Sequence, residues 1–154
     1  MGSYYKGSKK EIQALNTFIK FVRAAESLNS KINLMLSEFE LTESQFGVLD
    51  AIFHLGPLKQ KEIGKKILKS GGNITMVIVN LENRDLVKRK RGEKDRRHYN
   101  VSLTKSGKSK ITEVLPHFVK IIKKHFEILD STEQKELARL CKITGLQVRY
   151  QIKT

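Results

Sequence analysis

Hydrophobic residues change their spacing near the middle of the chain. They first recur at i, i+3, i+4 and i+7, the spacing of a helix that buries one face: Ile74, Val77, Ile78 and Leu81. Further along, the spacing becomes two, as in a strand that is buried on one side only: Tyr99, Val101 and Leu103. The pattern predicts a helix with a free outer face, followed at once by a two-stranded ribbon.

The ribbon carries the densest positive charge in the protein. We assign its first strand to Leu86–Arg91, its tip to Gly92–Arg97 and its return strand to His98–Leu103. From Arg84 to Arg97 there are eight lysines or arginines and three acidic residues. A helix with a free face beside a basic ribbon predicts a winged helix-turn-helix that reads DNA.

Two shorter helices are predicted before the helix that contains the stripe from Ile74 to Leu81. Thr42 and Gln45 have the spacing of a capping box, which opens a helix that Gly56-Pro57 ends. A third helix runs from about Lys59 to Leu68, and the lysines around it can either contact phosphates or form a solvated face.

The N-terminal part of the chain is predicted to be one long helix. Residues Lys9–Ser37 have apolar side chains at helical spacing, with no Pro or Gly, and extend about 40 Å at 1.5 Å per residue. A small lobe is too short to cover such a stripe. We therefore expect a partner for this helix.

Two further helices are predicted at the C-terminus. Thr104 should cap a helix that reaches about Ile128, and Pro116 inside it should kink or divide it. Ser131 and Gln134 match a second capping box, which opens a last helix with an apolar side: Leu137, Leu140, Cys141 and Val148. A second subunit would bury these stripes in a twofold interface.

The expected fold class is mainly α with a small β-hairpin wing (α+β). Residues 1–40 would form an N-terminal dimerisation helix, residues 41–104 a winged helix-turn-helix DNA-binding lobe, and residues 105–154 the C-terminal helices that complete the dimerisation region.

The outer face of the middle helix supplies the candidate base-reading residues. Ser70 can cap the helix, and Gly71-Gly72 let its backbone approach another surface closely. Asn can pair with adenine, and Thr and Met can contact the thymine methyl group. The candidate DNA-binding residues here are Ser70, Gly72, Asn73, Thr75, Met76, Asn80 and Arg84. For any single one of them, a plain solvent-facing role stays open.

The tip of the ribbon supplies a second set of candidates. Lys94, Arg96 and Arg97 can enter a minor groove, where the negative potential attracts guanidinium groups. Asp95 would oppose DNA unless it orients its neighbours, so we interpret it as a brace for one of the two arginines.

Composition supports a polyanionic partner and offers little support for catalysis. The net charge is +14 on 154 residues, which favours phosphate binding through counterion release. The four histidines lack the i, i+4 spacing of a zinc site, the single cysteine rules out a Cys pair, and no nucleophile motif is present. We expect no enzyme activity, cofactor or metal. Without an apolar run of about 20 residues or a signal peptide, we also expect a cytoplasmic protein with no membrane association.

Three stretches together resemble the MarR family of bacterial transcription regulators. They are the run from Ser70 to Val87, the triplet Asp95-Arg96-Arg97, and the run from Val101 to Gly107, which reads VSLTKSG. The resemblance implies a homodimer that binds double-stranded DNA at a pseudopalindromic operator, usually as a repressor, and is released by a small-molecule effector or by oxidation. It also implies that Arg97 is the minor-groove residue.

Two alternatives to the ligand-released repressor remain. A redox-responsive regulator would act through Cys141, but the long first helix, where thiol sensors of this family carry their reactive cysteine, has none. We favour an inert, packed thiol. A winged-helix interaction or architectural module is the second alternative, and it would need a neutral or acidic wing, which the basic ribbon does not provide.

Overall fold

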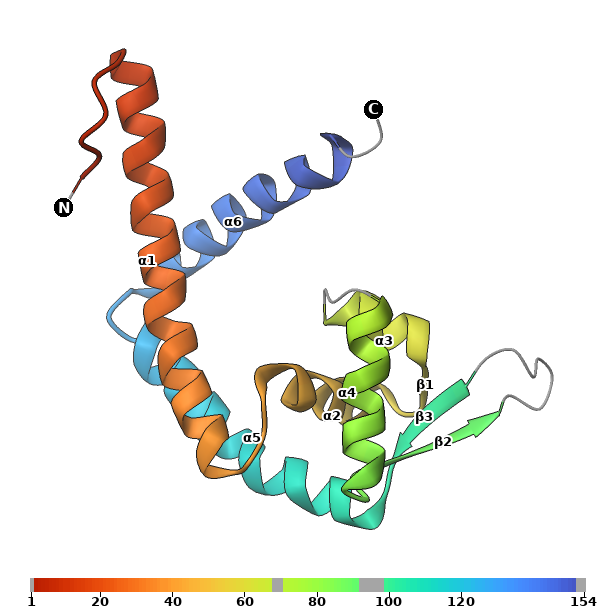
Figure 1. Cartoon of the computed structure of the whole chain (residues 1–154). Helices are drawn as coiled ribbons and strands as arrows, with labels where there is room; N and C mark the ends of the chain where they lie inside the picture. The colour runs from red at the N-terminus through yellow and green to blue at the C-terminus, as the bar shows by residue number, and fades with distance from the viewer. Residues whose placement is uncertain (1, 68–70, 92–98, 152–154) are drawn as a thin grey trace. The chain divides into compact units, whose positions relative to one another are not determined.

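The computed structural model describes residues 2–67, 71–91 and 99–151, and these residues form six helices and a three-stranded sheet (Figure 1). In chain order the elements are α1 (Lys9–Glu38), α2 (Glu43–Leu55), β1 (Leu58–Lys59), α3 (Gln60–Lys66), α4 (Gly71–Asn83), β2 (Val87–Arg91), β3 (Tyr99–Leu103), α5 (Lys105–Phe126) and α6 (Ser131–Gln151). The chain divides into two compact units, residues 1–119 and residues 120–154.

The core of the first unit lies where α2, α3 and α4 meet the sheet. The helical stripe predicted for α4 is confirmed, because Ile74, Ile78 and Leu81 are at most 1% exposed and Val77 is 8% exposed. From the other elements, the fully buried side chains include Val48, Leu49, Ile63 and Val101. α2 begins and ends as predicted: the Gln45 amide donates to Thr42 Oγ1 at 3.2 Å, and Gly56 ends the helix with a φ of 77°.

The sheet has one strand more than the predicted two-stranded ribbon. Its order is β1-β3-β2 and all pairs are antiparallel, with Leu58 opposite Val101 and Arg89 opposite Val101 on the other side. The third helix begins at Gln60, within one residue of its predicted start at about Lys59, and Lys59 both ends β1 and is the N-cap of α3. A strand of two residues shows no hydrophobic period, so its pairing could not be predicted from spacing.

α1 is the long helix that the sequence predicts. Ser8 caps it in a capping box with Glu11, and only residues near its C-terminal end are buried: Ile32, Met35 and Leu36. At the end of the helix the Phe39 ring contacts the His117 ring of α5, with the ring centres 5.1 Å apart and the planes tilted by 56°. None of the described helices is long and apolar enough to cross a membrane.

The C-terminal helices differ from the prediction at two points. α5 continues through Pro116 as one helix, so Pro116 does not divide it, and the alternative prediction of a kink stays a prediction. The cap of α6 is Asp130 and not Ser131, because the amides of Thr132 and Glu133 donate to Asp130 Oδ1 at 2.7 and 2.9 Å. Gln134 does not close a capping box either, since its Nε2 donates to the carbonyls of Phe126 and Leu129. The sequence holds two acceptable boxes one residue apart, and the stronger carboxylate acceptor is used.

Candidate nucleic-acid interface

The outer face of α4 is exposed, as the sequence predicts. Asn73, Thr75, Met76 and Asn80 are all exposed, and Met76 is 60% exposed although it is apolar. The opposite face of the same helix is packed into the core. α4 therefore offers two amides, a hydroxyl and a thioether on a rigid surface. Ser70 lies outside the described residues, and the surroundings of Gly72 are not described.

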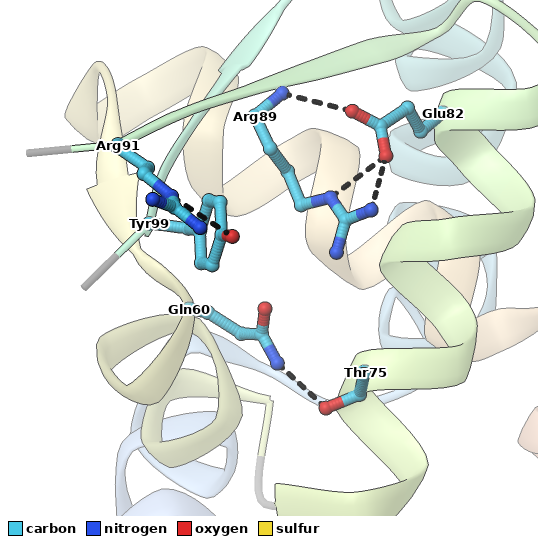
Figure 2. Close-up of polar contacts among 6 residues, drawn as sticks. All are labelled: Gln60, Thr75, Glu82, Arg89, Arg91 and Tyr99. Carbon is cyan, nitrogen blue, oxygen red and sulfur yellow. Dashed lines mark hydrogen bonds and ion pairs between the residues drawn. The ribbon is translucent and has the colours of Figure 1, made fainter. Parts of the chain in front are cut away.

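A hydrogen bond links the exposed face of α4 to α3. Gln60, the first residue of α3, donates from Nε2 to Thr75 Oγ1 at 2.6 Å (Figure 2). Both residues lie on the solvent side of the helix-turn-helix. The bond therefore joins a candidate base-reading side chain to a residue of the preceding helix.

An ion pair fastens the ribbon to the end of α4. Glu82 Oε2 accepts from Arg89 Nε at 2.7 Å and lies 2.6 Å from Arg89 Nη2, while Glu82 Oε1 accepts from the Arg89 amide at 3.2 Å (Figure 2). Hydrogen bonding by the Arg89 side chain lowers the pKa of Glu82 below its ordinary value. Because three donors meet one carboxylate, the pair fixes the position of β2 relative to α4.

A tyrosine lies between two arginines further along the ribbon. The Arg91 Nε donates to Tyr99 Oη at 3.3 Å, and the guanidinium carbons of Arg89 and Arg91 lie 5.6 and 5.8 Å from the centre of the Tyr99 ring. The hydrogen bond from Arg91 lowers the pKa of Tyr99. This stacking holds the two cations on one face of the sheet. Lys88, Lys90 and Arg91 are exposed on β2, so the base of the ribbon is strongly positive.

Arg84 lies beyond the end of α4 and has contacts inside the unit. Its Nη1 donates to the Glu40 carbonyl at 2.7 Å and to Gln45 Oε1 at 3.4 Å. These bonds tie the end of α4 to the turn before α2. A contact between Arg84 and DNA stays a prediction, and the geometry gives this side chain a structural role.

The turn after α4 fixes where the sheet joins α5. Thr104 caps α5, as predicted, because the Gly107 amide donates to its Oγ1 at 2.9 Å. A Cβ built on Gly107 would lie 1.8 Å from the Leu86 carbonyl oxygen. Only glycine fits at this crossing, which explains why the VSLTKSG stretch ends in one.

The structure leaves the predicted wing tip untested and adds residues that sequence reasoning missed. Lys94, Asp95, Arg96 and Arg97 lie outside the described residues, so the minor-groove contact and the brace stay predictions. Gln60, Glu82 and Arg89 are not among the residues that the sequence predicts for the site. Tyr99 is predicted only for the buried side of its strand, and that is wrong, because it is 37% exposed at the end of the strand. One signal is available for Arg89, which lies two residues after Val87 and therefore on the same, more buried side of β2, seven residues after Glu82.

Among the residues that the structure describes, no group of three His, Cys, Asp or Glu residues could hold a metal ion. Cys141 is a free thiol of intermediate exposure in α6.

Comparison by sequence finds transcription regulators. Residues 30–114 match the family model described as transcriptional regulator SarA/Rot. The HTH-type transcriptional regulator MhqR of Bacillus subtilis is 29% identical over 137 residues, which cover 89% of this chain and 94% of that protein. An uncharacterised HTH-type transcriptional regulator of Bacillus cereus is 30% identical over 124 residues, covering 80% of this chain and 82% of the relative.

Comparison by structure finds the same fold. AbsC, a MarR family regulator from Streptomyces coelicolor, superposes with a TM-score of 0.85 at 22% identity, over 94% of this chain and 99% of that chain. Sco3205 from the same organism, solved in complex with DNA, gives 0.83 at 19% identity over 93% and 91% of the two chains. BpsR of Bordetella bronchiseptica, whose DNA binding is regulated by 6-hydroxynicotinic acid, gives 0.75 at 23% identity over 84% and 98%.

Proposed function

Since this chain belongs to the SarA/Rot family and is a MarR-family winged-helix transcription regulator, we propose that it represses transcription as a homodimer bound to a pseudopalindromic operator. A small-molecule effector would release it from that operator. The protein is a DNA-binding regulator and not an enzyme.

The exposed face of α4 is the observation that carries this proposal. Asn73, Thr75, Met76 and Asn80 are exposed on a helix whose other face is buried, and the Glu82–Arg89 pair fastens that helix to a basic ribbon. An exposed helix face with these side chains fits the major groove, where the asparagine amides can distinguish base edges. The basic ribbon then lies where it can contact phosphates or the adjacent minor groove.

The homodimer is proposed from exposed apolar side chains on the long helices. In the first unit α1 exposes Phe18, Phe21 and Leu34, at 61%, 54% and 69%. In the second unit, considered by itself, α6 exposes Leu137, Leu140 and Ile143. A second copy of the chain presents the same surfaces, so pairing of like surfaces about a twofold axis would bury them. Two copies of α4 would then meet half-sites about one helical turn apart.

The effector is proposed by analogy with BpsR. Its DNA binding is regulated by 6-hydroxynicotinic acid, and a regulator of the same fold can use the same principle with a different ligand. A ligand that changes the distance between the two copies of α4 would weaken operator binding without contacting DNA.

Selection of genomic DNA tests the proposal. The wild-type protein is incubated with sheared genomic fragments, and the bound fragments are sequenced. We expect a small set of enriched fragments that share an inverted repeat. A variant with Asn73→Ala and Met76→Ala serves as the matched control and should enrich them less. If the wild-type protein enriches no fragment over random DNA, the proposal fails. Compounds are then screened for release from the enriched fragment.

A further inference from the structure

The hydrogen bond between Gln60 and Thr75 lies on the exposed side of the helix-turn-helix, and the proposed function does not by itself require it. We propose that Gln60 of α3 is a specificity-determining residue, which holds Thr75 in the orientation needed for base readout and extends the reading surface from α4 onto α3. This inference rests on the proposed function as a sequence-specific DNA-binding protein.

The chemistry of the contact makes the two residues one unit. A threonine hydroxyl can donate and accept, and it rotates to suit its surroundings. Here the Gln60 Nε2 donates to Thr75 Oγ1 at 2.6 Å, so one acceptor direction of the hydroxyl is occupied (Figure 2). The contact also helps to hold the Thr75 side chain in one rotamer and therefore contributes to where its methyl group points. The methyl group is the part of threonine that meets the thymine methyl group.

The remaining atoms of the Gln60 amide suit a base or phosphate contact. Figure 2 shows its carbonyl oxygen directed away from Thr75, and among the described residues no donor is bonded to that oxygen. One N–H of Nε2 is also left after the bond to Thr75, since a glutamine amide carries two. An acceptor beside a donor is the pair with which glutamine reads adenine. Gln60 is of intermediate exposure, and its bond to Thr75 lies on the exposed side of the unit.

The position of the Gln60–Thr75 hydrogen bond, outside the core and between two helices, makes it matter more for specificity than for folding. The core of this unit is built from the buried faces of α3 and α4, which hold Ile63 and Ile74. The Gln60–Thr75 bond lies outside that core on the exposed side. Its loss should therefore change which bases are preferred, with little effect on the melting temperature.

A double-mutant cycle on selected DNA tests the inference. Random duplexes are selected with the wild-type protein, and binding to the best duplex and to its single-base variants is measured at fixed salt for Gln60→Ala, Thr75→Val and the double variant. We expect each single substitution to reduce discrimination at the same base pair by about threefold to tenfold, the range of one hydrogen bond. The double variant should be no worse than either single variant. Thr75→Ser, which keeps the hydroxyl, should retain most of the discrimination.

Lys61→Ala is the matched control, because Lys61 is the exposed neighbour of Gln60 on α3. It should weaken binding to all duplexes equally and reduce the salt dependence. Additive effects of Gln60→Ala and Thr75→Val at different base pairs, or an unchanged base preference in Gln60→Ala, would overturn the inference and leave the proposed function standing. If the wild-type protein selects no sequence at all, the proposed function and this inference both fail.

Discussion

α4 and α1 both leave one face uncovered, but the two faces differ in chemistry. The free face of α4 holds two amides and a hydroxyl with one methionine, and its hydroxyl is already tied to a neighbouring helix. On the exposed part of α1, Phe18 and Phe21 lie three residues apart on one face. Polar groups held in fixed positions suit a surface that is itself polar and patterned, such as base edges. Aromatic side chains on a helix of 30 residues suit another protein surface.

The difference shows that an uncovered helix face identifies a partner only through its side chains. Periodicity predicts both helices equally well, and it gives no hint of which face meets DNA. Substitutions separate the two faces, because a change on α1 should alter assembly first and a change on α4 should alter base preference first.

The largest effect is expected when negative charges are introduced on the exposed aromatic positions of α1, which should weaken the dimer. Replacing Phe18 and Phe21 by glutamate should raise the dissociation constant of the dimer by about a thousandfold, because two aromatic anchors are lost. Sedimentation at micromolar concentration measures the change. Lys20→Glu, on the same helix, is the control and should have a small effect. A wild-type protein that sediments as a monomer would contradict the dimer.

A smaller effect is expected from Asn73→Ala on α4. The substitution should reduce discrimination at one base pair by about tenfold, since one amide contact to a base is lost, while non-specific binding stays the same. Binding to the selected duplex and to random DNA is compared at fixed salt. Asn83→Ala, at the other end of α4, is the control. An equal loss on both DNAs would make Asn73 a phosphate contact.

A still smaller effect is expected from removing the Glu82–Arg89 ion pair between α4 and the ribbon. Glu82→Ala removes the acceptor of the Arg89 amide and side chain, so we expect faster hydrogen exchange of the Arg89 amide and an operator affinity about threefold to tenfold lower. Glu113→Ala is the control, because the exposed Glu113 carboxylate forms a longer ion pair, at 3.8 Å from Lys110 Nζ, away from the ribbon. Unchanged exchange at Arg89 would show that the ribbon is held by other contacts.

The smallest effect is the pH dependence of the same link. The pKa of Glu82 is lowered in the folded protein from 4.5, so its contribution to the free energy of unfolding is present above pH 4.5 and is lost as the pH falls through the lowered value. The difference in unfolding free energy between the wild-type protein and Glu82→Gln should therefore shrink when the pH is taken from 7 to 3. A difference that stays constant over this range would contradict the pairing with Arg89.

The sequence predicted the helices well because their signals are long. The stripe of α4, the length of α1 and the capping box at Thr42 all span several residues, and each is confirmed. The misses involve short or competing signals. β1 has two residues and no period, and the cap of α6 was assigned one residue too late because Ser131 and Asp130 both suit that position.

The sequence predicts which exposed residues form the candidate site, but it does not predict the hydrogen bonds and ion pairs between them. Outward spacing on α4 placed Asn73, Thr75 and Met76 on the surface, which the structure confirms, although their contact with DNA stays a prediction. The Gln60–Thr75 and Glu82–Arg89 bonds join different elements. Their partners depend on how helices and strands pack, which spacing along one chain does not contain.

The most direct test of sequence-specific recognition by α4 is the ratio of two affinities. The wild-type protein is titrated, at one salt concentration, with the duplex that it selects and with a shuffled duplex of the same length and composition. We expect the selected duplex to bind at least about a thousandfold more tightly, because base contacts add to the phosphate contacts that both duplexes share. Equal affinities would show that the net charge of +14 drives binding by itself and would contradict a base-reading role for α4.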